Sequence, residues 1–293
     1  MIPIEILQKI RRIQITTAKK ATDMFAGEYK SVFKGRGLEF VEVREYLPGD
    51  EIRSIDWNVT ARMGRPFIKK FIEERELTIM FLLDASRSNC FGTVNRLKRD
   101  LAAEVCAVLA AAATKNNDRV GLIVFTDRIE LYLPPRKGTR HVFKVIREAL
   151  YREPEGTGTD IPLCLEHLNR FMTKSTITFM ISDFYAAGLR KPLSIASKRH
   201  DIVAVHVSDP RDAEMPDVGV VKLDDSETGR SYLLDTSDPA VRKEYAAKAA
   251  EKAEQLKKLF YAVNIDKVSV STAEPYEEAL IQFFQRRKMR RGR

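Results

Sequence analysis

Cysteine is scarce in this sequence, and long apolar runs are absent from it. The three cysteines among 293 residues are widely spaced, which favours neither a disulfide framework nor a cysteine metal site. No apolar run reaches the roughly 20 residues that a membrane-spanning helix needs. The first residues also lack the apolar stretch of a signal peptide. We therefore expect a cytoplasmic protein whose contact with a membrane is peripheral at most.

The motifs of several enzyme classes are also missing. There is no Gly-x-x-x-x-Gly-Lys-Ser/Thr loop, which argues against a P-loop ATPase. There is no Gly-x-Ser-x-Gly elbow of a serine hydrolase. No catalytic spacing relates the histidines, which are His141, His167, His200 and His206. The sequence therefore predicts a protein that is not an enzyme and that has no small-molecule substrate.

Positive charge is concentrated at one end of the chain. The formal net charge is +9, and residues 286–293 carry six of the positive charges, which leaves +3 for the rest. We interpret this segment as a solvated, frayed basic tail. A nucleic-acid binder acting through the tail is an alternative. However, the tail lacks the interleaved aromatic residues of a stacking platform, so nucleic-acid binding is not our expectation.

The N-terminal quarter has a patterning of its own. Residues 4–25 carry apolar side chains at helical spacing between lysines and arginines, which predicts a basic amphipathic helix docked on its own domain. Residues 38–43 alternate as a strand does, and the Pro-Gly-Asp sequence at 48–50 predicts a turn. Mixed charges surround the single tryptophan, Trp57, and they come from Arg44, Asp50, Arg53 and Asp56. We expect these residues to form structural ion pairs, and a surface that binds a partner is the alternative.

From residue 77 onward, predicted strands alternate with predicted helices. The strands are 77–83, 120–125, 129–133, 176–181, 202–207, 219–223, 231–235 and 267–271, and the helices are 93–114, 138–151, 161–172, 190–198, 238–260 and 275–286. This alternation predicts an α/β fold with a doubly wound, mainly parallel sheet. We assign residues 1–75 to a helix and turn-rich segment packed on the main domain. Residues 76–285 form that domain, and 286–293 form the basic tail.

A polar cluster follows the first strand of the main domain. Residues 77–83 are almost all apolar, and Asp84, Ser86 and Ser88 come directly after them. The carboxyl ends of parallel strands form the edge where open α/β sheets bind ligands. One carboxylate and two hydroxyls on a single turn are hard oxygen donors. They suit Mg²⁺ or Mn²⁺ rather than a soft metal.

Two further polar groups are expected at the same edge. The loop 155–160 holds Thr157 and Thr159 and precedes a predicted helix, and Asp183 follows the strand 176–181. Because strand ends converge at one edge, these groups and the Asp84 cluster supply five candidate oxygens for one ion.

The same residues have a second interpretation. Asp84 would then cap the following helix while the serines bond to local backbone N–H groups, and no ion would bind. Asp160, directly before a helix with Pro162 in its first turn, is more readily a helix cap than a metal ligand.

The three elements together resemble the metal-ion-dependent adhesion site of von Willebrand factor A domains, which have a Rossmann-like fold. That site combines Asp-x-Ser-x-Ser, a distant Gly-x-Thr loop and a later strand-end aspartate. The resemblance assigns Asp84, Ser86, Ser88, Thr159 and Asp183 as metal ligands. Thr157 is the alternative to Thr159. We prefer Thr159 because Leu165 then takes the apolar helix position of the family pattern.

A second resemblance covers nearly the whole chain. Arg44-Glu-Tyr-Leu-Pro-Gly-Asp50, followed by Arg53, Asp56-Trp57 and Ala61-Arg62, is similar to a bacterial family of uncharacterised von Willebrand A-like proteins. These proteins are encoded beside MoxR-type AAA+ ATPases. Many members carry N-terminal membrane helices, which this sequence lacks. The resemblance implies a metal-dependent interaction module acting in assembly, maturation or stress response. It also implies a protein partner, a MoxR-like ATPase or a client with an acidic ligand.

A metal-dependent hydrolase using the same cluster is the enzymatic alternative. Mg²⁺ held by two carboxylates at a sheet edge also serves phosphoryl transfer. Against this, Ser86 stands two residues after Asp84, where a haloacid-dehalogenase-like site would have a second aspartate. We therefore favour interaction over catalysis.

Overall fold

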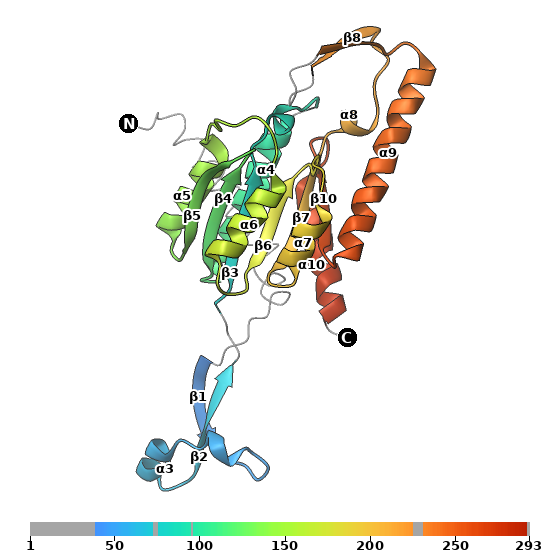
Figure 1. The fold of residues 1–293 in the computed structure, drawn as a ribbon. Coiled ribbons are helices and arrows are strands. Elements are labelled where there is room, and N and C mark those ends of the chain that lie inside the picture. The colour runs from blue at the N-terminus through green and yellow to red at the C-terminus, as the bar shows by residue number, and fades with distance from the viewer. Residues whose placement is uncertain (1–38, 73–75, 95, 225–230, 292–293) are drawn as a thin grey trace.

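The structure is a computed structural model that describes residues 39–72, 76–94, 96–224 and 231–291 (Figure 1). The helix predicted over residues 4–25 lies outside these ranges. Among the described helices, none is both long enough and apolar enough to cross a membrane. The cytoplasmic location stays a prediction.

A six-stranded sheet forms the centre of the main domain, in the order β10-β7-β6-β3-β4-β5. All neighbouring strands are parallel except β4 and β5, which form an antiparallel pair. The predicted mainly parallel sheet is therefore confirmed. The strands are β3 (Thr78–Asp84), β4 (Arg119–Phe125), β5 (Ile129–Arg136), β6 (Ile177–Ser182), β7 (Asp201–Ser208) and β10 (Asp266–Ser271).

Helices cover both faces of this sheet (Figure 1). One face packs against α4 (Lys98–Lys115), α5 (Thr139–Tyr151) and α10 (Tyr276–Arg291). The other packs against α6 (Ile161–Phe171), α7 (Arg190–Ser197) and α9 (Pro239–Ala262). Side chains alternate along a strand, so Ile79 and Phe81 of β3 join the first core while Met80 and Leu82 join the second. The doubly wound arrangement thus follows from a central strand that is apolar on both sides.

The helix predicted over 93–114 begins later, at Lys98. The preceding Leu97 is extended, and Val94 is 52% exposed, so neither contributes to the predicted apolar helix face. Asp209 accepts hydrogen bonds from the N–H and hydroxyl of Thr93, at 2.9 and 2.6 Å. These bonds tie the segment before α4 to the buried Asp209 carboxylate, which needs hydrogen-bond partners.

The basic C-terminal segment is helical and not frayed through most of its length. Helix α10 continues to Arg291. Arg287 is 6% exposed and forms ion pairs with Asp201 and, at 3.2 Å, with Asp266. Arg290 also reaches Asp266, at 2.8 Å. The expectation of a frayed tail from residue 286 was therefore wrong as far as Arg291, and Arg287 is buried because Asp201 and Asp266 pair with it. Lys288, Met289 and Arg290 are exposed, as expected of a solvated segment.

Two small antiparallel units flank the main domain. Strands β8 (Val220–Asp224) and β9 (Ser231–Asp235) pair with each other and not with the central sheet, and α8 (Pro210–Ala213) precedes them. Strands β1 (Glu39–Glu45) and β2 (Phe67–Ile72) form the second unit, with the 3₁₀ helix η1 (Ile52–Ser54) and α3 (Trp57–Met63) between them.

Local polar contacts stabilise the unit around β1 and β2. Arg44 forms the expected ion pair with Asp50, at 2.7 Å, and Asp56 caps α3 through the N–H of Asn58, at 3.0 Å. Figure 1 shows this unit set apart from the central sheet. The packing of residues 1–75 on the main domain involves residues outside the described ranges, and it stays a prediction.

Candidate metal centre

Asp84 ends the central strand β3 and is 1% exposed. The Ser182 hydroxyl, at the end of neighbouring β6, donates to Asp84 Oδ2 at 2.5 Å. The Ser86 N–H donates to Asp84 Oδ1 at 3.0 Å. Asp84 does not cap α4, which begins after Leu97 without any side-chain cap. These contacts therefore fix the carboxylate at the carboxyl edge of the sheet, as the metal-site interpretation requires.

The two serines of the motif lie together on the turn that follows. Ser86 Oγ and Ser88 Oγ are 3.1 Å apart, and the Asn89 amide donates to Ser86 Oγ at 3.3 Å. Neighbouring ligands of an octahedral Mg²⁺, each about 2.1 Å from the ion, lie roughly 3 Å apart. The spacing of the two hydroxyls thus fits a shared ion.

The loop 155–160 lies against this turn. The Arg87 N–H donates to the Thr157 carbonyl at 3.1 Å, which joins the loop to the motif. Thr159 Oγ1 is buried and has no hydrogen-bond partner in the described part of the chain. A buried hydroxyl without a partner is costly, and an ion ligated by it would remove that cost. Asp160 instead caps α6 through the N–H of Leu163, at 2.8 Å, as expected from its position.

Asp183 follows β6 and is 2% exposed. Its Oδ1 accepts the N–H of Tyr185 at 3.2 Å. Phe184, between these two residues, has a positive φ of 56°, which is uncommon for a side chain of this size. The turn that folds back onto Asp183 is thus held at some backbone strain, as is frequent at functional sites.

Burial and the nearness of the two carboxylates shift the protonation of the site. Burial raises the pKa of Asp84 to about 6, and repulsion from Asp183 adds to the rise. The hydrogen bonds from Ser182 and Ser86 oppose this without cancelling it. A cation shared by both carboxylates would relieve the repulsion. Among the described residues no three His, Cys, Asp or Glu side chains form a metal cluster, so hydroxyls have to complete the donor set.

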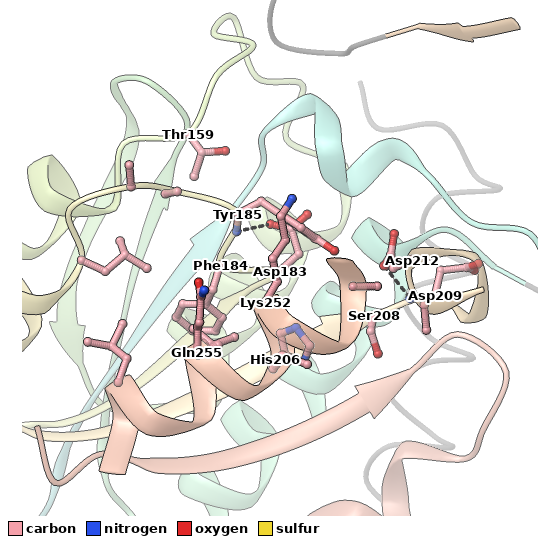
Figure 2. A pocket seen from close by; sticks show the side chains of 18 of the residues that line it. Thr159, Asp183, Phe184, Tyr185, His206, Ser208, Asp209, Asp212, Lys252 and Gln255 are labelled. Carbon is pink, nitrogen blue, oxygen red and sulfur yellow. Dashed lines mark hydrogen bonds between the residues drawn. The ribbon is translucent and has the colours of Figure 1, made fainter. Parts of the chain in front are cut away.

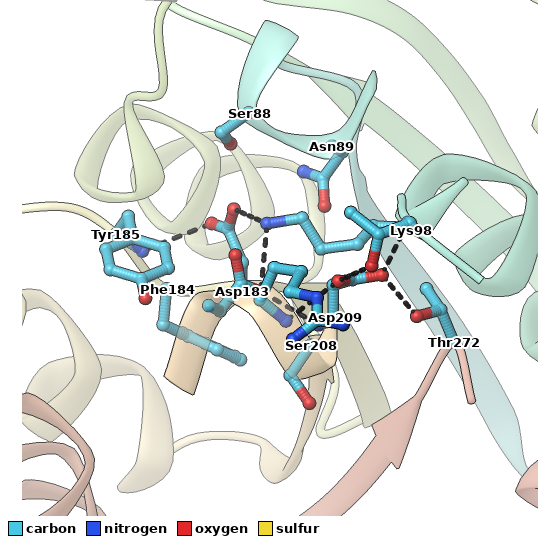
Figure 3. A network of polar contacts seen from close by, with 12 residues as sticks. Ser88, Asn89, Lys98, Asp183, Phe184, Tyr185, Ser208, Asp209 and Thr272 are labelled. Atoms are coloured by element: carbon cyan, nitrogen blue, oxygen red, sulfur yellow. Dashed lines mark hydrogen bonds and ion pairs between the residues drawn. The ribbon is translucent and has the colours of Figure 1, made fainter. Parts of the chain in front are cut away.

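Lys98 belongs to this site, although sequence reasoning missed it. Lys98 is the first residue of α4 and is 2% exposed. Its Nζ lies 3.1 Å from Asp183 Oδ2 and 3.4 Å from Asp212 Oδ2 (Figure 3). The rings of Phe91 and Tyr185 lie 5.9 and 5.7 Å from the same nitrogen. A lysine in the first turn of a helix usually points to solvent, so the sequence offered no signal for its burial.

A cleft of about 1090 Å³ opens beside the site (Figure 2). The residues that line it include Thr159, Asp183 and, from α9, Lys252 and Leu256. The cleft therefore offers room for a side chain from another molecule to approach the candidate ligands.

Residues 42–255 match the model of a family described as "Protein of unknown function DUF58". The chain belongs to the DUF58 family. It is 31% identical over 284 residues to the uncharacterized protein Rv1480 of Mycobacterium tuberculosis (strain ATCC 25618 / H37Rv). The aligned region covers 95% of this chain and 89% of Rv1480.

Two solved structures also resemble this DUF58 chain. The conserved hypothetical protein BatB from Bacteroides thetaiotaomicron matches with a TM-score of 0.45 and 17% identity, over 73% of this chain and 99% of BatB. The SpRpn10 VWA domain matches with a TM-score of 0.38 and 10% identity, over 71% of this chain and 95% of the domain.

Proposed function

We propose that this DUF58 protein is a metal-dependent protein-interaction module. Mg²⁺ or Mn²⁺ is held by side-chain oxygens of Asp84, Ser86, Ser88, Thr159 and Asp183. One coordination position of the ion is left for an acidic side chain of a protein partner. A bound divalent ion supplies a Lewis-acidic point that a carboxylate recognises. Three observations support the proposal: Asp84 and Asp183 are both buried and repel each other, Ser86 Oγ lies 3.1 Å from Ser88 Oγ, and Thr159 Oγ1 is buried with no hydrogen-bond partner among the described residues.

Interaction is favoured over catalysis by the way the hydroxyls are held. Ser86 Oγ is engaged by Ser88 and Asn89, so it is not paired with a general base that would activate it as a nucleophile. The residues around Asp84 thus have the character of ligands and their supports. We also propose that the protein is not an enzyme and does not bind nucleic acid.

The partner follows from the resemblance of the sequence to proteins encoded beside MoxR-type AAA+ ATPases. We propose a MoxR-like ATPase as the first partner to test, and a client with an exposed acidic ligand as the second. In both cases the cleft beside Asp183 provides the approach for the carboxylate.

The decisive experiment measures ion binding and partner capture with the same variants. We expect Mn²⁺ binding by calorimetry to weaken more than roughly 100-fold in Asp84→Ala, because even an outer-shell change at a metal site commonly costs 10–100-fold. Asp217→Ala is the matched control, since Asp217 is exposed and pairs with Arg242 outside the site.

Partner capture should depend on the same carboxylate. The MoxR-like ATPase should be retained by the wild type in Mg²⁺, and lost with chelator or with Asp84→Ala. Equal retention by the wild type and Asp84→Ala in Mg²⁺ would contradict the proposal. Release of phosphate from aryl phosphates that depends on Asp84 would instead support the hydrolase alternative.

A further inference from the structure

We propose that the Lys98 ammonium competes with the divalent ion for Asp183 and thereby sets the ion affinity of the site. This inference rests on the proposed function. It assigns to Lys98 the part of an internal counter-cation, which bonds Asp183 while no ion is bound and moves onto Asp212 when one binds.

The contacts of Lys98 place it on a ligand of the candidate centre. Its Nζ donates to Asp183 Oδ2 at 3.1 Å, and the side chains of Lys98 and Asp183 are 3% and 0% exposed (Figure 3). The second Asp183 oxygen accepts the Tyr185 N–H. Both oxygens of this carboxylate are therefore already engaged. An ion that ligates Asp183 has to share it with a buried ammonium, and two cations at one buried carboxylate repel each other.

A second position for the ammonium lies close by. Asp212 Oδ2 is 3.4 Å from Lys98 Nζ, and the Asp212 side chain is 19% exposed. The rings of Phe91 and Tyr185 lie within 6 Å of the nitrogen and favour a cation there. A small movement of the lysine end thus exchanges Asp183 for Asp212 without leaving a buried charge unpaired.

Asp212 is itself held in place by hydrogen bonds. Asp212 Oδ2 accepts the Asp209 N–H at 2.8 Å, and Asp209 in turn accepts from the hydroxyls of Thr93 and Thr272. These bonds join α8 to the loop before α4 and to the end of β10. The alternative carboxylate for Lys98 is therefore a built feature of the fold and not a passing surface contact.

This arrangement has a consequence for recognition. Without an ion, Lys98 offsets the charge of Asp183, which would otherwise face the Asp84 carboxylate without that ammonium. The affinity for the ion alone is then lower than the five oxygens would provide. The carboxylate of an acidic partner adds the missing attraction, so ion and partner bind more tightly together than separately.

The test measures Mn²⁺ affinity by calorimetry in full-length wild type, Lys98→Met and Lys248→Met. Lys98→Met keeps the apolar length and removes the ammonium, and we expect Mn²⁺ to bind roughly tenfold tighter or more. Lys248 is the control, because its ammonium is exposed, pairs with Glu244 on the same helix, and is not among the residues that line the cleft. We expect its removal to change the affinity less than about threefold, since exposed charges are screened. Equal gains in the two variants would overturn direct competition.

Asp212→Asn tests the second position of the lysine. In the wild-type background it should weaken Mn²⁺ binding, because Lys98 then has only Asp183. In the Lys98→Met background the same change should have little effect. An equal loss in both backgrounds would mean that Asp212 acts only as a distant charge, and it would overturn the exchange.

The melting temperature gives a second measure of Mn²⁺ binding, and it also detects binding that is too weak for calorimetry. Lys98→Met should melt lower than the wild type in chelator, and Mn²⁺ should raise its melting temperature more than that of the wild type. Lys98→Gln serves the same purpose if Lys98→Met does not fold.

The proposed function and the inference fail in different ways. Binding that depends on Asp84 in the wild type but is unchanged or weaker without Lys98 overturns the inference alone. Absence of Asp84-dependent binding in both the wild type and the Lys98 variants overturns both.

Discussion

At the scale of single residues, the candidate centre consists of polar groups that are expensive to bury. Asp84 is buried beside another carboxylate, and Thr159 Oγ1 is buried with no hydrogen-bond partner among the residues that the structure describes. Such groups lower the stability of the folded protein unless a bound ligand interacts with them. Their concentration at one sheet edge is what separates a binding site from an ordinary strand end.

The unpaired hydroxyl of Thr159 leads to a prediction that also decides between the two loop threonines. Thr159→Val should weaken Mn²⁺ binding by about tenfold, because one ligand is lost. In chelator it should leave the free energy of unfolding unchanged or raise it by about 0.5–1 kcal/mol, because an unsatisfied buried hydroxyl is replaced by a methyl group. Calorimetry and urea unfolding measure the two effects.

Thr157→Val is the control for this experiment, since Thr157 meets the motif through its backbone carbonyl. A loss of ion binding in Thr157→Val and none in Thr159→Val would assign the ligand to Thr157.

At the scale of elements, the loop 155–160 reaches the site only because it packs tightly on the β4–β5 turn. The Gly156 N–H donates to Glu130 Oε1 at 2.8 Å, and the Asp160 N–H donates to the Thr126 carbonyl at 2.8 Å. A Cβ on Gly156 would lie 2.0 Å from Asp127 Oδ1 and 2.1 Å from Thr126 Oγ1. A close approach of this kind requires glycine.

We therefore expect Gly156→Ala to displace the loop. It should lower the free energy of unfolding by about 1–3 kcal/mol, as overpacking does, and weaken Mn²⁺ binding through the loss of Thr159. Gly158→Ala is the matched control, because a Cβ there would meet only Asp127 Cβ, at 3.6 Å. Equal effects of the two substitutions in calorimetry and urea unfolding would contradict this account of the loop.

At the scale of the whole molecule, a buried histidine links stability to pH. His200 is 2% exposed, and its Nδ1 lies 3.3 Å from the Thr176 N–H that donates to it. Burial lowers the pKa of His200 to about 4. The unfolded chain, with a pKa near 6.5, then binds more protons than the folded protein between these values. Stability from neutral His200 is complete above pH 6.5 and is lost as the pH falls toward 4.

We predict that the wild type loses about 2 kcal/mol more unfolding free energy than His200→Asn between pH 7.5 and pH 5.0. Asparagine keeps an acceptor for Thr176 and does not titrate. Urea unfolding in chelator measures the difference. Asp84, with its raised pKa, acts in the opposite direction in both proteins and cancels in the comparison. Parallel pH profiles would show that protonation of His200 does not govern this loss.

Much of this molecule could be predicted from local patterns in the sequence. The apolar run of β3 predicted a strand buried on both faces, and the alternation of strands and helices predicted the doubly wound sheet. Asp84, Ser86 and Ser88 are close in sequence, so a single turn suffices to bring them together. The loop 155–160 and Asp183 were expected near them from the rule that parallel strand ends share an edge. The choice of Thr159 within the loop came from the resemblance to the metal-ion-dependent adhesion site.

Only the tertiary structure revealed the contacts that link distant segments. Lys98 pairs with Asp183, 85 residues away, and Arg287 lies between Asp201 and Asp266. The local sequence around each of these cations predicts a helix turn exposed to solvent. Charge and helical spacing alone do not show which segments will pack against a helix. A charged group is buried only where the fold brings an oppositely charged partner close to it. The sequence contains that partner residue but does not show that the two lie close together.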